Sequence, residues 1–145
     1  MKTIMVLNGP NLNLLGERDA GHYGSQTLED IHGMLEKNYP EVSFIFMQSN
    51  SEGDHVDALH TCRNGSVDAV VANWGGFTHS SVAIHDALEL LSIPKVEVHL
   101  SNIHAREEFR ERSITGRAAN GIITGFGADS YRLGVEAALN LLNGK

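Results

Sequence analysis

The fold of this 145-residue chain is decided near its start, by the stretch Ile4-Met5-Val6-Leu7-Asn8-Gly9-Pro10-Asn11-Leu12-Asn13-Leu14-Leu15-Gly16. Its first four residues are apolar and predict a buried β-strand. A long connection rich in glycine and asparagine follows, and the next helical pattern begins only near Thr27. Connections of this length inside a compact domain are usually functional or disordered. The amide side chains here can donate and accept hydrogen bonds, which favours a functional loop.

An arginine and a tyrosine, Arg18 and Tyr23, lie five positions apart in this loop. A free phenol has a pKa of about 10 and is almost entirely protonated at pH 7. A nearby guanidinium in a partly closed site stabilises the phenolate. Tyr23 is then a candidate general base, able to take a proton from a carbon next to a ketone. The alternative, on these two residues alone, is that Arg18 is a solvated cation and Tyr23 packs on the scaffold.

Length and composition limit the class of protein. With 41% hydrophobic residues, we expect residues 1–145 to form a single domain with its own core. The formal net charge of -7 disfavours a nucleic-acid binder, which needs clustered lysine and arginine. The single cysteine, Cys62, excludes an intramolecular disulfide. Since no apolar run has the length of a signal segment or a membrane span, we expect a soluble, cytoplasmic protein without a membrane partner.

Apolar runs of strand length alternate with helical patterns along the chain. The predicted strands are residues 4–7, 42–47, 69–72, 95–100 and 121–124. The predicted helices are residues 27–38, 51 to about 64, 80–91 and 129–142, with a short charged helical stretch over 105–111. Five strands separated by helices indicate βαβ units and a parallel sheet. The predicted fold class is α/β and flavodoxin-like, a five-stranded parallel sheet with helices on both faces.

Two helices carry more detailed predictions. Thr27-Leu28-Glu29-Asp30 has the form of a capping box, which places the start of the first helix. In the helix predicted over 80–91, spacing favours Val82, Ala83, Leu88 and Leu91 as the inward-facing residues.

Ligands of such a sheet bind outside the carboxyl ends of its strands. The polar segments that follow the first four strands are Asn8 with Asn11, residues 48–50, residues 73–81 and residues 97–102. Amides, hydroxyls, two histidines and a carboxylate therefore meet at one edge. This edge predicts a site for a neutral-to-anionic small molecule rich in hydroxyl groups.

Other functions of this fold are disfavoured by single positions. A response regulator needs acidic residues where the chain has Asn8 and Asn73. Gly125-Phe126-Gly127 lacks the third glycine of a dinucleotide loop. The histidines show no metal-ligand spacing, so we expect no metal, and Lys95 begins its strand at the wrong edge for a Schiff base. A ketone substrate then requires an enolate mechanism, with a base, donors for the enolate oxygen and an acid.

Several long motifs occur in one order: Asn8-Gly9-Pro10-Asn11-Leu12-Asn13-Leu14-Leu15-Gly16-x-Arg18, Tyr23-Gly24, Gln48-Ser49-Asn50-x-Glu52-Gly53, Asn73-x-Gly75-Gly76-x-Thr78-His79-x-Ser81-Val82-Ala83 and Glu97-Val98-His99-x-Ser101-Asn102-x-x-x-Arg106-Glu107-Glu108-x-Arg110. With them the chain closely resembles the type II 3-dehydroquinate dehydratases, over nearly its whole length. The resemblance implies dehydration of 3-dehydroquinate to 3-dehydroshikimate by anti elimination through an enolate, in the shikimate pathway or in quinate breakdown. It implies no metal and no organic cofactor.

The resemblance also implies catalytic roles. Tyr23 would be the base that removes the C2 proton, and Arg18 the cation that favours its phenolate. Asn11 would hold the water or oxygen group that stabilises the enolate. His99, oriented by Glu97, would be the acid that protonates the departing C1 hydroxyl.

Further residues would bind substrate. Asn73, the amides of Leu100 and Ser101, and the Ser101 hydroxyl would bind the carboxylate end of the ring. His79 and Arg110 would contact the ring hydroxyls and the carbonyl side.

The resemblance also concerns the oligomer, and the chain departs from the family pattern at two places. Asp86 would reach the neighbouring subunit's site, since the family forms trimers assembled into a homododecamer. His85 stands where arginine is frequent. Asp19 and Ala20 replace a usual Glu-Pro, and loss of the proline should loosen the loop.

Taken singly, the same residues have simpler interpretations. His99 can be a satisfied histidine at the sheet edge, Asn73 a helix cap, and the charged run 106–112 a solvated helix face. Two other functions stay open: a non-catalytic oligomeric binding module for cyclic polyol acids, and a metal-dependent hydrolase.

Overall fold

The computed structural model describes residues 1–17 and 26–144. Arg18 and Tyr23, with the departures Asp19 and Ala20, lie outside the described residues. Their predicted roles therefore rest on the sequence motifs alone.

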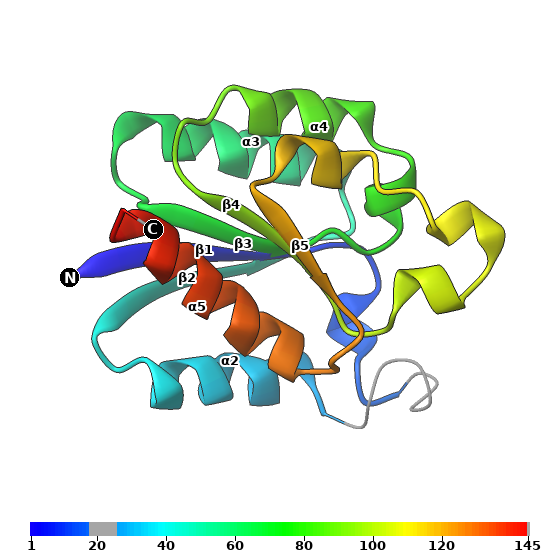
Figure 1. The fold of residues 1–145 in the computed structure, drawn as a ribbon, viewed down its shortest axis with the longest axis horizontal. Coiled ribbons are helices and arrows are strands. Elements are labelled where there is room, and N and C mark those ends of the chain that lie inside the picture. Colours follow the sequence, from blue (N-terminus) through cyan, green and yellow to red (C-terminus); the bar gives the residue numbers. More distant parts are fainter. Residues whose placement is uncertain (18–25, 145) are drawn as a thin grey trace.

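The sheet has five parallel strands in the order β2-β1-β3-β4-β5 (Figure 1). The strands are β1 (Lys2–Asn8), β2 (Val42–Gln48), β3 (Ala69–Asn73), β4 (Lys95–His99) and β5 (Gly121–Thr124). This order is the flavodoxin-like one. The chain adds β2 on one side of β1 and the later strands on the other side, so the strand order reverses between β1 and β3. The predicted fold class is confirmed.

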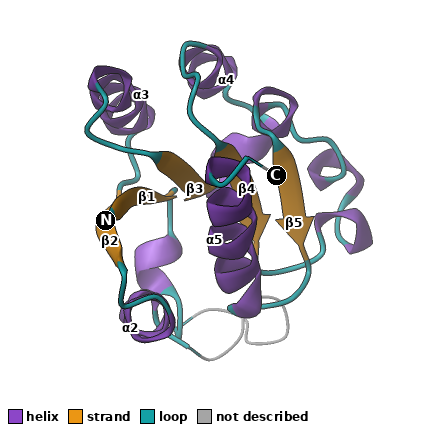
Figure 2. Cartoon of the chain, turned by 60° about the vertical axis from the view of Figure 1, so that its left-hand side comes forward, coloured by secondary structure: helices purple, strands orange, loops and turns teal. Residues whose placement is uncertain are grey.

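Helices cover both faces of the sheet (Figures 1 and 2). One face carries α2 (Leu28–Asn38) and α5 (Asp129–Leu142), and the other carries α3 (Glu52–Thr61) and α4 (Val82–Glu89). None of the helices in the described part of the chain combines the length and apolar character that a membrane crossing needs.

Side-chain caps mark the starts of α2 and α4. The predicted capping box is present: the Thr27 hydroxyl accepts from the Asp30 amide at 3.1 Å, and the Asp30 carboxylate accepts from the Thr27 amide at 3.0 Å. Helix α4 starts later than predicted because Ser81, with an extended backbone, caps it by accepting from the Ile84 amide at 2.9 Å.

Two sequence predictions were wrong in this region. Val82 and Ala83 face outward, and Val82 is 58% exposed, because the cap at Ser81 turns Ile84 and Ala87 toward the core instead. The charged stretch over 105–111 forms short 3₁₀ turns, Ile103–Ala105 and Glu108–Arg110, rather than one helix. The second turn has no buried residue, and packing of an apolar face provides most of a helix's stability.

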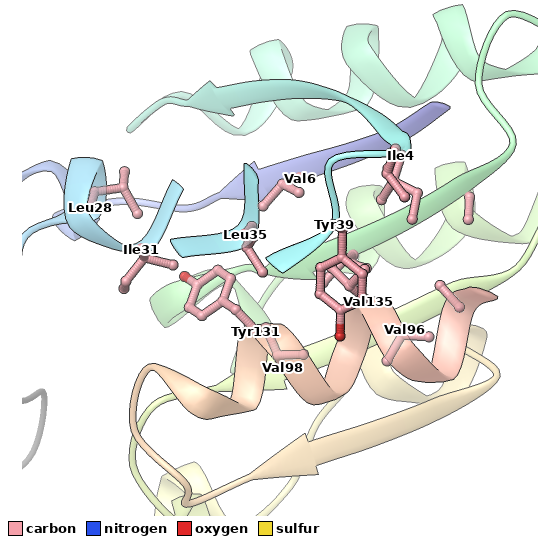
Figure 3. Close-up of a cluster of buried hydrophobic side chains, with 14 of the residues drawn as sticks. Ile4, Val6, Leu28, Ile31, Leu35, Tyr39, Val96, Val98, Tyr131 and Val135 are labelled. Atoms are coloured by element: carbon pink, nitrogen blue, oxygen red, sulfur yellow. The ribbon is translucent and has the colours of Figure 1, made fainter. Parts of the chain in front are cut away.

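The core consists of two layers, one on each side of the sheet. Figure 3 shows the layer between the sheet, α2 and α5, where Ile31, Leu35, Tyr131 and Val135 are buried. The other layer lies beneath α3 and α4. Because both faces are covered, β3 is buried at every residue, as its unbroken apolar run predicts.

Gly134 allows α5 to lie close to the sheet. A Cβ atom there would lie 2.6 Å from Val98 Cγ1 and 3.1 Å from Val71 Cγ1. We expect Gly134→Ala to lower the free energy of unfolding by about 1–3 kcal/mol through overpacking, despite the better helix propensity of alanine. Urea unfolding of the variant measures this change.

The matched control is Gly33→Ala, at an exposed site within α2 where a Cβ atom meets nothing within 4 Å. Helix propensity alone should raise the free energy of unfolding there by roughly 0.5–1 kcal/mol. Equal stabilisation of both variants would show that the contact at Gly134 is not tight.

Candidate active site

A cavity of about 130 Å³ lies at the carboxyl ends of β1, β3 and β4. Its lining includes several predicted site residues: Asn11, Asn73, His79, His99, Leu100, Ser101 and Arg110. The other lining residues in the described part of the chain are Pro10, Leu12, Gly75, Gly76, Ile103 and Arg106. The structure thus brings together seven of the eleven predicted site residues.

The loops after β1 and β3 are held together by their backbones. The Gly9 amide donates to the Asn73 carbonyl at 2.7 Å. A Cβ atom on Gly9 would lie 2.0 Å from the Trp74 carbonyl oxygen, so only glycine permits this approach. Asn11 has a left-handed backbone with φ of 69°, a conformation that asparagine tolerates, and its amide donates to Asn50 Oδ1 at 2.9 Å. These contacts hold two pocket walls in fixed positions.

A buried carboxylate and imidazole, Glu97 and His99, lie at the end of β4. His99 Nε2 is 2.8 Å from Glu97 Oε2. An ionised carboxylate can only accept, so Nε2 carries a proton in this pair. The other ring nitrogen, Nδ1, is therefore the one that can exchange a proton with a ligand.

Two hydroxyls complete the surroundings of Glu97. Ser113 Oγ donates to Glu97 Oε2 at 2.7 Å, and Thr115 Oγ1 donates to Oε1. A buried carboxylate needs such donors, since an unpaired buried charge is strongly destabilising. Sequence reasoning missed both residues, because nothing in the pattern distinguishes these hydroxyls from the other hydroxyls of the chain.

His79 is a neutral histidine with a defined tautomer. Its Nδ1 is 2.9 Å from the Arg112 carbonyl, which can only accept, so Nδ1 carries the proton. Partial burial lowers the pKa of His79, with a smaller effect in the same direction from Arg110. Nε2 is thus left as an acceptor, suited to a ligand hydroxyl.

Two guanidinium groups, Arg106 and Arg110, line the pocket. Arg106 donates to the Ser101 hydroxyl at 3.4 Å, and Arg110 donates to the Glu107 carboxylate at 2.9 Å. The described lining residues include no carboxylate, so the pocket favours an anionic ligand. The sequence placed Arg106 in a matching motif but gave it no role in the site.

Asp86 does not reach the pocket of its own chain. It lies on the outer side of α4 with 67% of its side chain exposed, 3.2 Å from His85. His85, Asp86 and Glu89 lie close enough to share a metal ion, but they are not part of the pocket lining. Asp86 is therefore a surface residue of α4 and not part of the lining of this pocket.

Fold and pocket together define an α/β protein with a cation-rich small-molecule site at the carboxyl edge of its sheet. Residues 2–139 match the family model described as "Dehydroquinase class II". The chain is 51% identical over 140 residues to 3-dehydroquinate dehydratase of Pelodictyon phaeoclathratiforme, covering 96% of this chain and 93% of that protein. It is 49% identical over 144 residues to 3-dehydroquinate dehydratase 1 of Pseudomonas putida, covering 98% and 95%.

A solved structure agrees with these relatives. Type II dehydroquinase from Butyrivibrio crossotus is 39% identical, with a TM-score of 0.90 over 98% of this chain and 97% of that one. This chain belongs to the class II dehydroquinase family.

A buried histidine, His55, makes the scaffold behind the pocket sensitive to acid. Its ring packs edge-on against Trp74 and Phe77, with centroids 5.5 and 6.1 Å away. Burial lowers the pKa of His55 below its ordinary value of about 6.5. As the pH falls below that value, the unfolded chain binds the proton first, so the free energy of unfolding decreases.

We expect His55→Gln, which can still donate to the Ser49 carbonyl, to reduce this loss of stability. One such histidine contributes up to about 1.4 kcal/mol per pH unit below its unfolded pKa. Urea unfolding at pH 7.5 and 5.5 measures the difference. His60→Gln, at an exposed position of the same helix, should retain the wild-type pH dependence. Identical pH dependence in both variants would exclude His55 as the cause.

Proposed function

We propose that this chain dehydrates 3-dehydroquinate to 3-dehydroshikimate by anti elimination through an enolate, within a single domain spanning residues 1–145. The chain is a hydro-lyase of the 3-dehydroquinate dehydratase family, as its relatives are named. The observation that carries the proposal is the buried Glu97–His99 pair, which opens into a pocket with two guanidinium groups. Such a site combines a proton donor with cations that suit a hydroxy acid.

His99 acts as the acid in this proposal. Its Nδ1 gives a proton to the C1 hydroxyl as that group departs, so water is released. Glu97 accepts from Nε2 and so fixes the orientation of the imidazole ring, with Nδ1 left toward the ligand. The 2.8 Å contact between the two side chains supports this role.

Tyr23 acts as the base that removes the C2 proton, and the Arg18 cation favours its phenolate. Both roles rest on the family motif. Asn11 holds the water or oxygen group that stabilises the enolate, and its location in the pocket lining supports that role.

The carboxylate end of the ring binds to Asn73, to the amides of Leu100 and Ser101, and to the Ser101 hydroxyl. His79 accepts from a ring hydroxyl through Nε2, and Arg110 contacts the carbonyl side. Their presence in one cavity supports these contacts.

Asp86 serves the neighbouring subunit's site in a homododecamer built from trimers. Its exposure outside its own pocket supports this placement.

The decisive experiment follows ultraviolet absorbance after chelator-treated protein is mixed with 3-dehydroquinate, since the product has a conjugated enone and the substrate has not. We expect the absorbance to rise at a rate proportional to protein concentration.

Tyr23→Phe should bind substrate but lose turnover by roughly 10²–10⁴-fold. No turnover from folded wild-type protein that binds substrate would identify a binding module instead. Activity lost on chelation and restored by metal would favour a metal-dependent enzyme.

The hydroxyl of Thr115 should affect turnover through its hydrogen bond to Glu97. We expect Thr115→Val, of similar shape, to lower kcat by roughly tenfold or more with little change in KM, because a hydrogen bond to a charged group contributes about 1.5–3 kcal/mol. Steady-state kinetics measures this.

Thr61→Val removes a hydroxyl from an exposed position of α3 and serves as the control. An unchanged kcat in a folded Thr115→Val variant would contradict the role of this hydroxyl.

A further inference from the structure

Tyr131 lies behind the pocket, on α5, with no exposed surface. Its hydroxyl sits between two asparagine side chains from the ends of neighbouring strands. It donates to Asn8 Oδ1 at 2.6 Å and accepts from Asn73 Nδ2 at 3.1 Å. Of these three residues only Asn73 lines the cavity. Tyr131 therefore contacts the site through Asn73.

The direction of these hydrogen bonds is fixed at both ends by backbone groups. At one end, Asn8 Nδ2 is 3.4 Å from the Met47 carbonyl, which can only accept. At the other, Asn73 Oδ1 is 3.2 Å from the Gly75 amide, which can only donate. The tyrosine hydroxyl has a single proton, and it is directed to Asn8. One assignment of donors and acceptors satisfies every contact.

Rotating the Asn73 amide by 180° would break this arrangement. Its Nδ2 would then face the Gly75 amide, donor against donor, and its Oδ1 would face a hydroxyl whose proton is already used by Asn8. A buried polar group left unpaired costs about 1–3 kcal/mol. Burial also raises the pKa of Tyr131, which keeps its proton in place. Asn73 Nδ2 thus has one hydrogen bound to Tyr131 and a second one left to donate.

We propose that Tyr131 is a positioning residue that holds the Asn73 amide with its second N–H toward the ligand, and that it thereby makes this end of the pocket selective for a carboxylate. The inference rests on the proposed function, in which Asn73 binds the carboxylate end of the ring. A carboxylate accepts only, whereas an uncharged carboxamide presents donors as well. Because the Asn73 amide can offer only an N–H to the ligand, the pocket distinguishes a carboxylate from a carboxamide.

A double-mutant cycle tests whether Tyr131 acts through Asn73. We expect Tyr131→Phe to raise KM for 3-dehydroquinate about tenfold, with a smaller change in kcat, since one hydrogen bond contributes roughly that factor. In an Asn73→Ala background the same change should alter KM less than about twofold, because the two residues then no longer interact. Equal effects in both backgrounds would overturn the proposal. If Asn73→Ala alone leaves KM unchanged, both the proposed role of Asn73 and this inference fail.

Ligand selectivity gives a second readout that does not depend on turnover. Calorimetry compares the Kd of quinate with that of its carboxamide. Wild-type protein should prefer the carboxylate, and Tyr131→Phe should reduce that preference by about three- to tenfold. Absence of a preference in the wild type would overturn the inference even if turnover is normal. Absence of turnover with the preference intact would contradict the proposed function instead.

Tyr39→Phe is the matched control. Tyr39 is also buried against α5, but its hydroxyl donates to Glu136 at 3.0 Å and it does not line the cavity. Tyr39→Phe should leave KM, and the ratio of the Kd values for quinate and its carboxamide, as in the wild type.

If Tyr131→Phe does not fold, the wild-type protein still decides the question by nuclear magnetic resonance. Quinate should shift one of the two Asn73 Nδ2 proton signals strongly and the other weakly. Equal shifts of the two, or none, would overturn the proposal.

Discussion

The pocket depends on a contact between two backbones, Gly9 against Trp74. The space between them is too small for a single methyl group, since a Cβ atom on Gly9 would lie 2.0 Å from the Trp74 carbonyl oxygen. The Gly9 amide also donates to the Asn73 carbonyl. The close approach and this hydrogen bond hold the loop after β1 against the loop after β3, which places Asn11 and Asn73 on the same cavity. Side chains that must meet one small ligand need this precision, because small displacements sharply reduce the rate of a reaction.

A buried charge accounts for much of the polar structure around β4. Glu97 is almost completely removed from water, and its two oxygens accept from His99, Ser113 and Thr115. Removing an ion from water costs several kcal/mol even in a relaxed protein, and only well-placed donors offset that cost. The loop after residue 112 is thus part of the site, although it contributes no residue to the pocket lining. The histidine, carboxylate and hydroxyls form one unit.

Periodicity and caps predicted the strands, the sheet class and most helix ends, because these depend on residues close in sequence. β5 and α5 have the predicted bounds, and the Thr27 box is present. The motifs likewise predicted most of the residues that line the pocket. The start of α4 and the contacts of Ser113, Thr115 and Tyr131 were not predictable, since a hydroxyl's partner 16 to 123 residues away leaves no mark on local pattern.

The two arginines of the pocket belong to a chain whose formal net charge is -7. An anion far from the protein is therefore repelled by the molecule as a whole, and the nearby cations dominate only close to the pocket. In 0.1 M salt, charges more than about 10 Å apart are largely screened from each other. Dissolved salt weakens the distant repulsion first and the close attraction last. Capture of an anionic ligand should thus be favoured by the ionic strength of ordinary physiological fluid, in contrast to proteins whose whole surface attracts their substrate.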